Sequence, residues 1–183
     1  CRDWSSDVCS SDLEVDRIEG IIRKLVDAAN RTRLVVDDIR LDQVVQDALA
    51  IFSPQIEARQ IQVQFTCQES APPIKADRTE LEQIFTNLLM NAVEELPQGG
   101  QLSVQISCPE GLIEVRVSDN GSGIAADHLD AIFKPFFSTK SRGTGIGLPV
   151  ARRIARLYHG DVKVEQTSPQ GTTFLVTIPR EQK

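Results

Sequence analysis

Residues 140–156, KSRGTGIGLPVARRIAR, place a glycine-rich loop directly before an amphipathic helix. Gly143, Gly145 and Gly147 alternate through the loop, and apolar residues then recur with helical spacing. Glycines allow a backbone to approach a ligand closely, and the free N–H groups of a helix N-terminus attract anions. The stretch therefore predicts a phosphate-binding loop. A dinucleotide-binding turn and a plain turn before a helix have the same pattern, so both remain alternatives at this point.

Composition and charge narrow the class of protein. The chain has 183 residues, 40% of them hydrophobic, which suits one globular domain with an appendage. The net charge of -6 argues against nucleic-acid binding, which favours a basic face. No apolar run approaches the length that crosses a membrane, and no signal peptide is evident. We therefore expect a cytoplasmic protein without a membrane segment.

The four cysteines show no CxxC pair, and two of them, Cys67 and Cys108, lie in strand-like stretches. We interpret these two as small buried apolar residues, without a disulfide or metal role, in a reducing compartment.

The N-terminal region differs from the rest of the chain. Residues 1–13, CRDWSSDVCSSDL, have no periodicity and resemble a translated sequencing-library adapter, so we exclude them from fold prediction. If so, the natural protein continues upstream of residue 14. Residues 14–36 carry a narrow apolar seam with helical spacing, which is typical of a helix that packs on another helix.

The remaining pattern alternates helices with paired strands. We predict helices that begin at Asp42 and end before Pro54, and over 79–95 and 145–158; strands are predicted over 61–65, from Ile74, and over 101–108, 112–118, 162–166 and 172–178. Turns with Pro and Gly join the last two strand pairs as hairpins. This order predicts an α/β (α+β) fold, a two-layer sandwich whose mixed sheet has helices on one face.

The helix predicted over 79–95 has two chemically different faces. Asn87, Asn91 and either Glu94 or Glu95 fall on one face, opposite an apolar face. Asparagine is unfavourable inside helices, so two of them four residues apart need a reason. An amide oxygen is a good ligand for Mg²⁺, which also bridges phosphates. Plain solvated polar residues are the alternative.

Two further motifs precede the glycine-rich loop. In 119–124, DNGSGI, a carboxylate ends a strand and can accept the exocyclic amine of adenine, although a polar turn has the same composition. In 133–140, FKPFFSTK, aromatic residues next to a lysine indicate a mobile cover with a cation near phosphate. Core phenylalanines that anchor a loop are the alternative for this stretch.

A dinucleotide-binding fold fits poorly. Leu148 occupies the position of the third glycine of that motif, no buried strand precedes the loop, and only hairpin strands follow it.

The order of the motifs resembles the N, G1, F, G2 and terminal glycine boxes of the sensor histidine kinases. They are the asparagine helix, DNGSGI, FKPFFSTK, GTGIGL and finally GTTF at 171–174. The resemblance covers 37–183 and implies the Bergerat ATP-binding fold, shared with gyrase-type and mismatch-repair ATPases. Residues 14–36 resemble the second helix of the dimerisation and histidine-phosphotransfer hairpin.

The resemblance also implies roles for individual residues. Asn91 would be the Mg²⁺ ligand, supported by Asn87, and Asp119 would bind adenine, backed by Thr172. Lys140 and its neighbours would form a lid over ATP, and residues 134–145 would be the least ordered part of the domain when no nucleotide is bound. The remaining positions would shape the adenine pocket or hold phosphates: Gly121, Gly123, Gly143, Thr144, Gly145, Gly147 and Leu148.

A further residue choice bears on the reaction. In the ATP-hydrolysing relatives, the position one turn before the Mg²⁺ ligand holds a glutamate base, whereas this chain has Asn87. An amide cannot activate water, so the resemblance implies transfer of the γ-phosphate to another nucleophile. That nucleophile would be a histidine on a dimerisation hairpin of the same or a partner chain, in a homodimer, with relay to the receiver domain of a response regulator.

The phosphoacceptor histidine itself is not evident. The chain has only His128 and His159, and neither has the sequence context of a phosphoacceptor. We therefore expect this fragment to have no catalytic histidine and to bind ATP and Mg²⁺ without phosphorylating itself. The alternatives are a non-catalytic nucleotide-binding scaffold and a serine kinase of the anti-sigma type, against which the seam at 14–36 argues.

Overall fold

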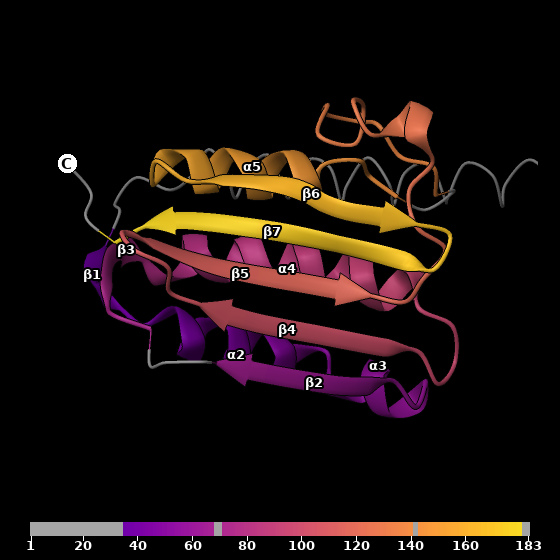
Figure 1. Cartoon of the computed structure of the whole chain (residues 1–183), viewed down its shortest axis with the longest axis horizontal. Coiled ribbons are helices and arrows are strands. Elements are labelled where there is room, and N and C mark those ends of the chain that lie inside the picture. The colour runs from indigo at the N-terminus through magenta and orange to yellow at the C-terminus, as the bar shows by residue number, and fades with distance from the viewer. Residues whose placement is uncertain (1–34, 68–70, 141–142, 181–183) are drawn as a thin grey trace, which may run out of the picture.

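The computed structural model describes residues 35–67, 71–140 and 143–180. The predictions for residues 1–13 and for nearly all of 14–36 lie outside these residues. The described part forms two layers, a sheet and a layer of helices behind it (Figure 1). The predicted two-layer α/β sandwich is confirmed.

A five-stranded mixed sheet forms one layer, in the order β2-β4-β5-β7-β6. Its strands are β2 (Gln62–Cys67), β4 (Gln101–Ser107), β5 (Leu112–Asp119), β6 (Asp161–Ser168) and β7 (Gly171–Pro179). β2 and β4 are parallel, whereas every other neighbouring pair is antiparallel. The two predicted hairpins, β4–β5 and β6–β7, are therefore present.

Helices cover one face of this sheet (Figure 1). They are α2 (Leu41–Ile51), α3 (Ser53–Ala58), α4 (Arg78–Glu95) and α5 (Gly147–Leu157), with a short 3₁₀ helix, η1 (Ala126–His128), between β5 and α5. Alternate residues of each strand point toward the helices, as strand geometry requires. The core thus joins strand residues such as Val104 and Val117 to Phe85 and Leu88 of α4, all fully buried or nearly so.

Two elements differ from the prediction. The helix predicted to end before Pro54 does so, at Ile51, but a second helix that was not predicted, α3, begins at Ser53 and holds Pro54 in its first turn. Proline is compatible with that turn because its missing N–H has no intrahelical partner there.

The second difference is a small additional sheet. Strand β1 (Val36–Ile39) pairs antiparallel with β3 (Ile74–Asp77). Val36, placed by the sequence in the N-terminal helix, therefore belongs to a strand.

Across the described ranges, no helix combines the length and the apolar character that crossing a bilayer requires.

Candidate functional site

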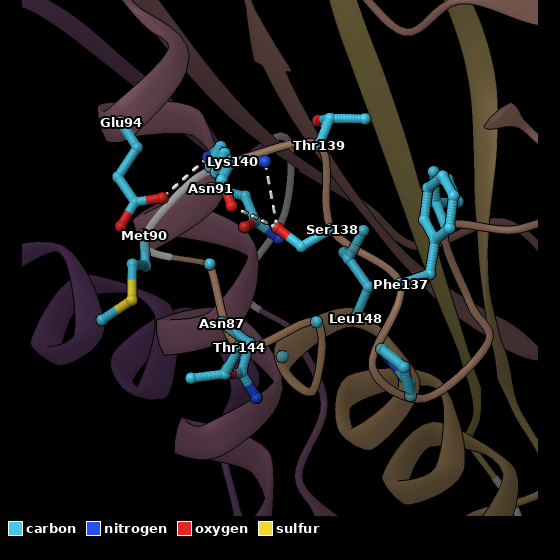
Figure 2. Close-up of a pocket in the computed structure, with 15 residues that line it drawn as sticks. Asn87, Met90, Asn91, Glu94, Phe137, Ser138, Thr139, Lys140, Thr144 and Leu148 are labelled. Atoms are coloured by element: carbon cyan, nitrogen blue, oxygen red, sulfur yellow. Dashed lines mark hydrogen bonds and ion pairs between the residues drawn. The ribbon is translucent and has the colours of Figure 1, made fainter. Parts of the chain in front are cut away.

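Helix α4 carries the predicted polar face. Its N-terminus is capped by Asp77, whose carboxylate accepts hydrogen bonds from the backbone N–H groups of Thr79 (2.8 Å) and Glu80 (3.4 Å). On the solvent side, Asn87, Asn91 and Glu94 line a cavity of about 180 Å³. Figure 2 shows these side chains facing the segment that runs from Phe137 to Leu148.

The glycine-rich loop forms the opposite wall of this cavity, which we call the α5 cavity. Gly145 has φ of +65°, and a Cβ atom there would lie 2.5 Å from the carbonyl carbon of Phe136. Gly147 begins α5, and a Cβ atom would lie 3.2 Å from the amide oxygen of Asn87. The loop therefore needs glycine at position 145, where φ is left-handed and the backbone approaches closely, and it brings the N-terminus of α5 next to Asn87.

Lys140 crosses the α5 cavity to the end of α4. Its Nζ lies 2.7 Å from a carboxylate oxygen of Glu94 and 3.0 Å from one of Glu95 (Figure 2 shows the first contact). Burial by itself would lower the pKa of Lys140, but the hydrogen bonds to the two glutamates outweigh it and leave the pKa raised. Lys140 is therefore positively charged at neutral pH.

A second cavity of about 120 Å³ adjoins the first, and we call it the Asp119 cavity. The two cavities share the lining residues Asn91, Ile132, Lys140 and Leu148. Burial raises the pKa of the Asp119 carboxyl above its usual value, partly offset by hydrogen bonds from the backbone N–H groups of Gly121 and Thr172. A half-buried carboxylate beside apolar side chains is suited to accept hydrogen bonds from a flat polar ligand.

Thr172 and the loop after Asp119 are connected by hydroxyl contacts. Thr172 is buried, and its hydroxyl lies 3.1 Å from that of Thr167 on β6. The Thr167 hydroxyl accepts a 2.8 Å hydrogen bond from the backbone N–H of Ile124. Position 123 in this loop requires glycine, because a Cβ atom there would lie only 1.9 Å from the carbonyl oxygen of Ser168. Thr172 thus supports the floor of the Asp119 cavity through Thr167.

The structure brings nearly all predicted site residues to these cavities. Lining the α5 cavity are Asn87, Asn91, Lys140, Gly143, Thr144, Gly145, Gly147 and Leu148. The Asp119 cavity adds Asp119, Gly123 and Thr172. Gly121 lines neither cavity, but its backbone N–H donates a 2.9 Å hydrogen bond to the Asp119 carboxylate. The prediction that 134–145 is poorly ordered includes residues 141–142, which lie outside the described residues.

Sequence reasoning missed several lining residues. Ile132 contributes an apolar wall of the Asp119 cavity, and Met90 and Pro149 line the α5 cavity. Glu95, predicted from the sequence as an alternative to Glu94, lies with Asp119 in the same cavity. Thr167 was not singled out, because a threonine in a strand carries no local signal of a ligand pocket. Ile132 had a detectable signal, since it directly precedes the aromatic motif at 133–140.

The two histidines lie at the ends of helices. His128 ends η1, and its ring makes an edge contact with the Phe137 ring at 5.3 Å between centroids. His159 follows α5 with φ of +58°, so it takes the left-handed position that ends the helix. Gly160 comes next, where a Cβ atom would lie 1.9 Å from the carbonyl oxygen of Thr177.

The cavities fit a nucleotide with its cation. The side-chain nitrogen of Asn87 is buried with no hydrogen-bond partner among the described atoms, and the amide of Asn91 lines both cavities. Amide oxygens suit Mg²⁺, and the glycine loop before α5 suits phosphate.

This arrangement of a mixed sheet, an asparagine-bearing helix and a glycine loop defines a class of ATP-binding domain. The model of the family described as "Histidine kinase-, DNA gyrase B-, and HSP90-like ATPase" matches residues 76–182, and the chain belongs to this family.

The chain is similar to sensor histidine kinases within the family. It is 36% identical over 166 residues to the sensor histidine kinase ZraS of Escherichia coli K12, covering 91% of this chain and 36% of ZraS. The chain thus spans about a third of that relative. The solved catalytic domain of histidine kinase ThkA is 27% identical, with a TM-score of 0.74 over 80% of this chain and 96% of that one. ThkA in complex with the response regulator protein TrrA has a TM-score of 0.79 at 23% identity, covering 100% of this chain and 54% of that one.

Proposed function

We propose that this chain is the ATP-binding catalytic part of a two-component sensor histidine kinase. It binds ATP with Mg²⁺ and transfers the γ-phosphoryl group to a histidine on a dimerisation hairpin, for relay to an aspartate of a response regulator. One observation carries the proposal: the Asp119 cavity and the glycine-walled α5 cavity meet at Asn91 and Lys140. Adenine and a triphosphate need two such connected sites.

Different residues bind different parts of the nucleotide. Asp119 accepts a hydrogen bond from the exocyclic amine of adenine, and the backbone of the loop Gly143–Gly147 with the N-terminus of α5 binds phosphates. Asn91 would hold Mg²⁺ through its amide oxygen, and bound Mg²⁺ would supply charge neutralisation at the phosphates. Lys140 adds a positive charge to the same region.

Asn87 supports transfer rather than hydrolysis. Its amide lies against Gly147 at the entry to α5, with a buried nitrogen that has no partner among the described atoms. An amide can orient a phosphate oxygen, but it cannot take a proton from water. ATP held here therefore keeps its γ-phosphoryl group for an incoming nucleophile.

The proposed partners follow from the same chemistry. The nucleophile is a histidine on a dimerisation hairpin, in the same chain or in the partner of a homodimer, because neither His128 nor His159 has a suitable setting. The ThkA complex with TrrA supports a response regulator as the next partner. We further propose that the domain works in the cytoplasm, where ATP is available and where cysteines such as Cys67 and Cys108 stay reduced.

A nucleotide titration tests the binding step. We expect Asp119→Asn to weaken binding of a fluorescent ATP analogue roughly ten- to a hundredfold, because a hydrogen bond to a charged acceptor contributes about 1.5–3 kcal/mol. Asp127→Asn is the matched control, since it removes an exposed carboxylate on η1. Equal affinities of the two variants would contradict the role of Asp119.

A transfer assay tests the reaction. With radiolabelled ATP, the chain alone should gain no acid-labile phosphate, whereas a separately supplied dimerisation hairpin with its histidine should be labelled. Nucleotide binding without any transfer would instead favour a non-catalytic scaffold, and acid-stable label on a serine would favour a serine kinase.

A further inference from the structure

We infer that Glu94 and Glu95 form a counter-ion latch for Lys140 that the phosphates of ATP displace. The latch is the pair of ion pairs from Lys140 to the two glutamates, and the inference rests on the proposed function. It assigns to both glutamates a positioning role: they hold Lys140 over the cavities until nucleotide arrives.

The position of Lys140 is the first support. The ammonium group lies where the two cavities join, because Lys140 lines both. Glu94 lines the α5 cavity and Glu95 lines the Asp119 cavity, so each partner comes from a different side of the junction. A nucleotide that fills both cavities must therefore pass the ammonium group and its two carboxylate partners.

The placement of the glutamates on α4 is the second support. Glu94 and Glu95 are the last two residues of the helix, where the helix dipole and their mutual repulsion both disfavour negative charge. Arg59, the other cation at this helix end, is occupied with the backbone carbonyl oxygens of Val93 and Leu96. Lys140 therefore neutralises a pair of charges that α4 alone would place unfavourably.

Competition for the ammonium group is the third support. An ammonium has three donors, and two of them already serve Glu94 and Glu95. The side chains of all three residues keep 30–50% of their surface exposed, so the ion pairs are partly screened by water and break readily. Phosphate oxygens that enter the α5 cavity compete for the same donors, and Lys140 exchanges one set of anions for the other.

A double-mutant cycle on nucleotide affinity tests the exchange. The dissociation constant for a fluorescent ATP analogue with Mg²⁺ is measured for the wild type, Glu94→Gln/Glu95→Gln, Lys140→Met and the triple variant. Repulsion between the glutamates and phosphate acts in both backgrounds and cancels in the cycle. We expect the glutamine pair to tighten binding at least threefold more when Lys140 is present than in the Lys140→Met background.

A second readout follows the latch without nucleotide. Trypsin cleavage after Lys140 should be several-fold faster in Glu94→Gln/Glu95→Gln than in the wild type. Glu82→Gln is the control, because Glu82 lies on the same helix but pairs with Arg78. An equal effect of the glutamine pair in both backgrounds, or unchanged cleavage, would overturn the latch. If the wild type failed to bind the analogue at all, the proposed function itself would fail.

Discussion

Asp119 and Thr172 are direct partners across the antiparallel pair β5–β7, and both line the cavity that we propose binds adenine. The last residue of β5 thus projects its carboxylate beside a buried threonine at the start of β7. Burial of the carboxylate raises its pKa, and the hydrogen bond from the backbone N–H of Thr172 offsets part of this shift.

The first prediction concerns the stability cost of that carboxylate. Because burial raises the pKa of Asp119, the charged form destabilises the folded domain at neutral pH. Asp119→Asn should therefore raise the midpoint of thermal unfolding without nucleotide, while it weakens ATP binding. Differential scanning calorimetry measures this shift.

The difference in stability between the wild type and Asp119→Asn should also depend on pH. A raised pKa means that the protonated form is favoured in the folded state, so the wild type loses stability as the pH rises through that pKa. The advantage of Asp119→Asn should be largest near neutral pH and shrink as the pH approaches the ordinary aspartate value of 3.8. A difference that stayed constant from pH 3.8 up to neutral pH would contradict this explanation.

The second prediction tests whether Gly145 is required because the backbone of Phe136 lies close to it, or only because its φ is positive. Gly145→Ala and Gly99→Ala both place a Cβ at positive φ, which costs about 1–2 kcal/mol, but only the alanine at 145 would also meet the backbone of Phe136. Gly145→Ala should therefore abolish measurable nucleotide binding, whereas Gly99→Ala should keep the wild-type affinity. Similar affinities for both variants would show that the loop tolerates a wider shape.

The third prediction concerns a buried contact far from the cavities. The Tyr158 hydroxyl donates a 2.6 Å hydrogen bond to Glu80 and accepts one of 3.0 Å from the backbone N–H of Asp77. Tyr158→Phe leaves both groups without this partner, so the free energy of unfolding should fall by about 1–3 kcal/mol. Urea denaturation measures the loss, and an unchanged midpoint would mean that water replaces the hydroxyl.

Tyrosine absorbance gives an independent check, because Tyr158 is the only tyrosine in the chain. Burial and the hydrogen bond to Glu80 raise its pKa far above the ordinary value of 10.0. The folded chain should therefore show no tyrosinate signal at pH 10, and the stability that Tyr158 contributes should be lost as the pH rises further.

The fourth prediction concerns Thr167. Thr167→Val keeps the shape of the side chain but removes the acceptor for the backbone N–H of Ile124 and the contact with Thr172. We expect ATP binding to weaken about threefold to tenfold, since one neutral hydrogen bond contributes about 1 kcal/mol. Thr66→Val, on the exposed face of β2, is the matched control. A loss no larger than in the control would remove Thr167 from the pocket floor.

Local patterns accounted for much of the fold. Strict alternation in 101–107 and 112–118 marks strands with one buried face, and the 3.6-residue spacing in 79–95 marks α4. Strand β1 was missed because VDDI has an exposed, acidic pattern, and it becomes a strand only by pairing with β3. Pro54 was interpreted as the end of a helix because its compatibility with a first turn has no separate signal.

The candidate site, like the fold, could be predicted from the sequence only in part. The polar face of α4 follows from helical spacing alone, so Asn87 and Asn91 could be placed together. The contact of Lys140 with Glu94 joins residues 46 positions apart, and its formation depends on how the loop before α5 folds back on α4. Such contacts between distant segments leave no local pattern in the sequence.

The small sheet of β1 and β3 sets a limit on where the chain can be shortened. The backbone N–H of Val35 donates a 3.1 Å hydrogen bond to the Asp77 carboxylate, the same group that caps α4. A chain that started after Ile39 would lose this donor and the partner strand of β3, although its matched family region begins only at residue 76. The helix that carries the asparagines therefore depends, at its first turn, on residues outside the region by which the family is recognised.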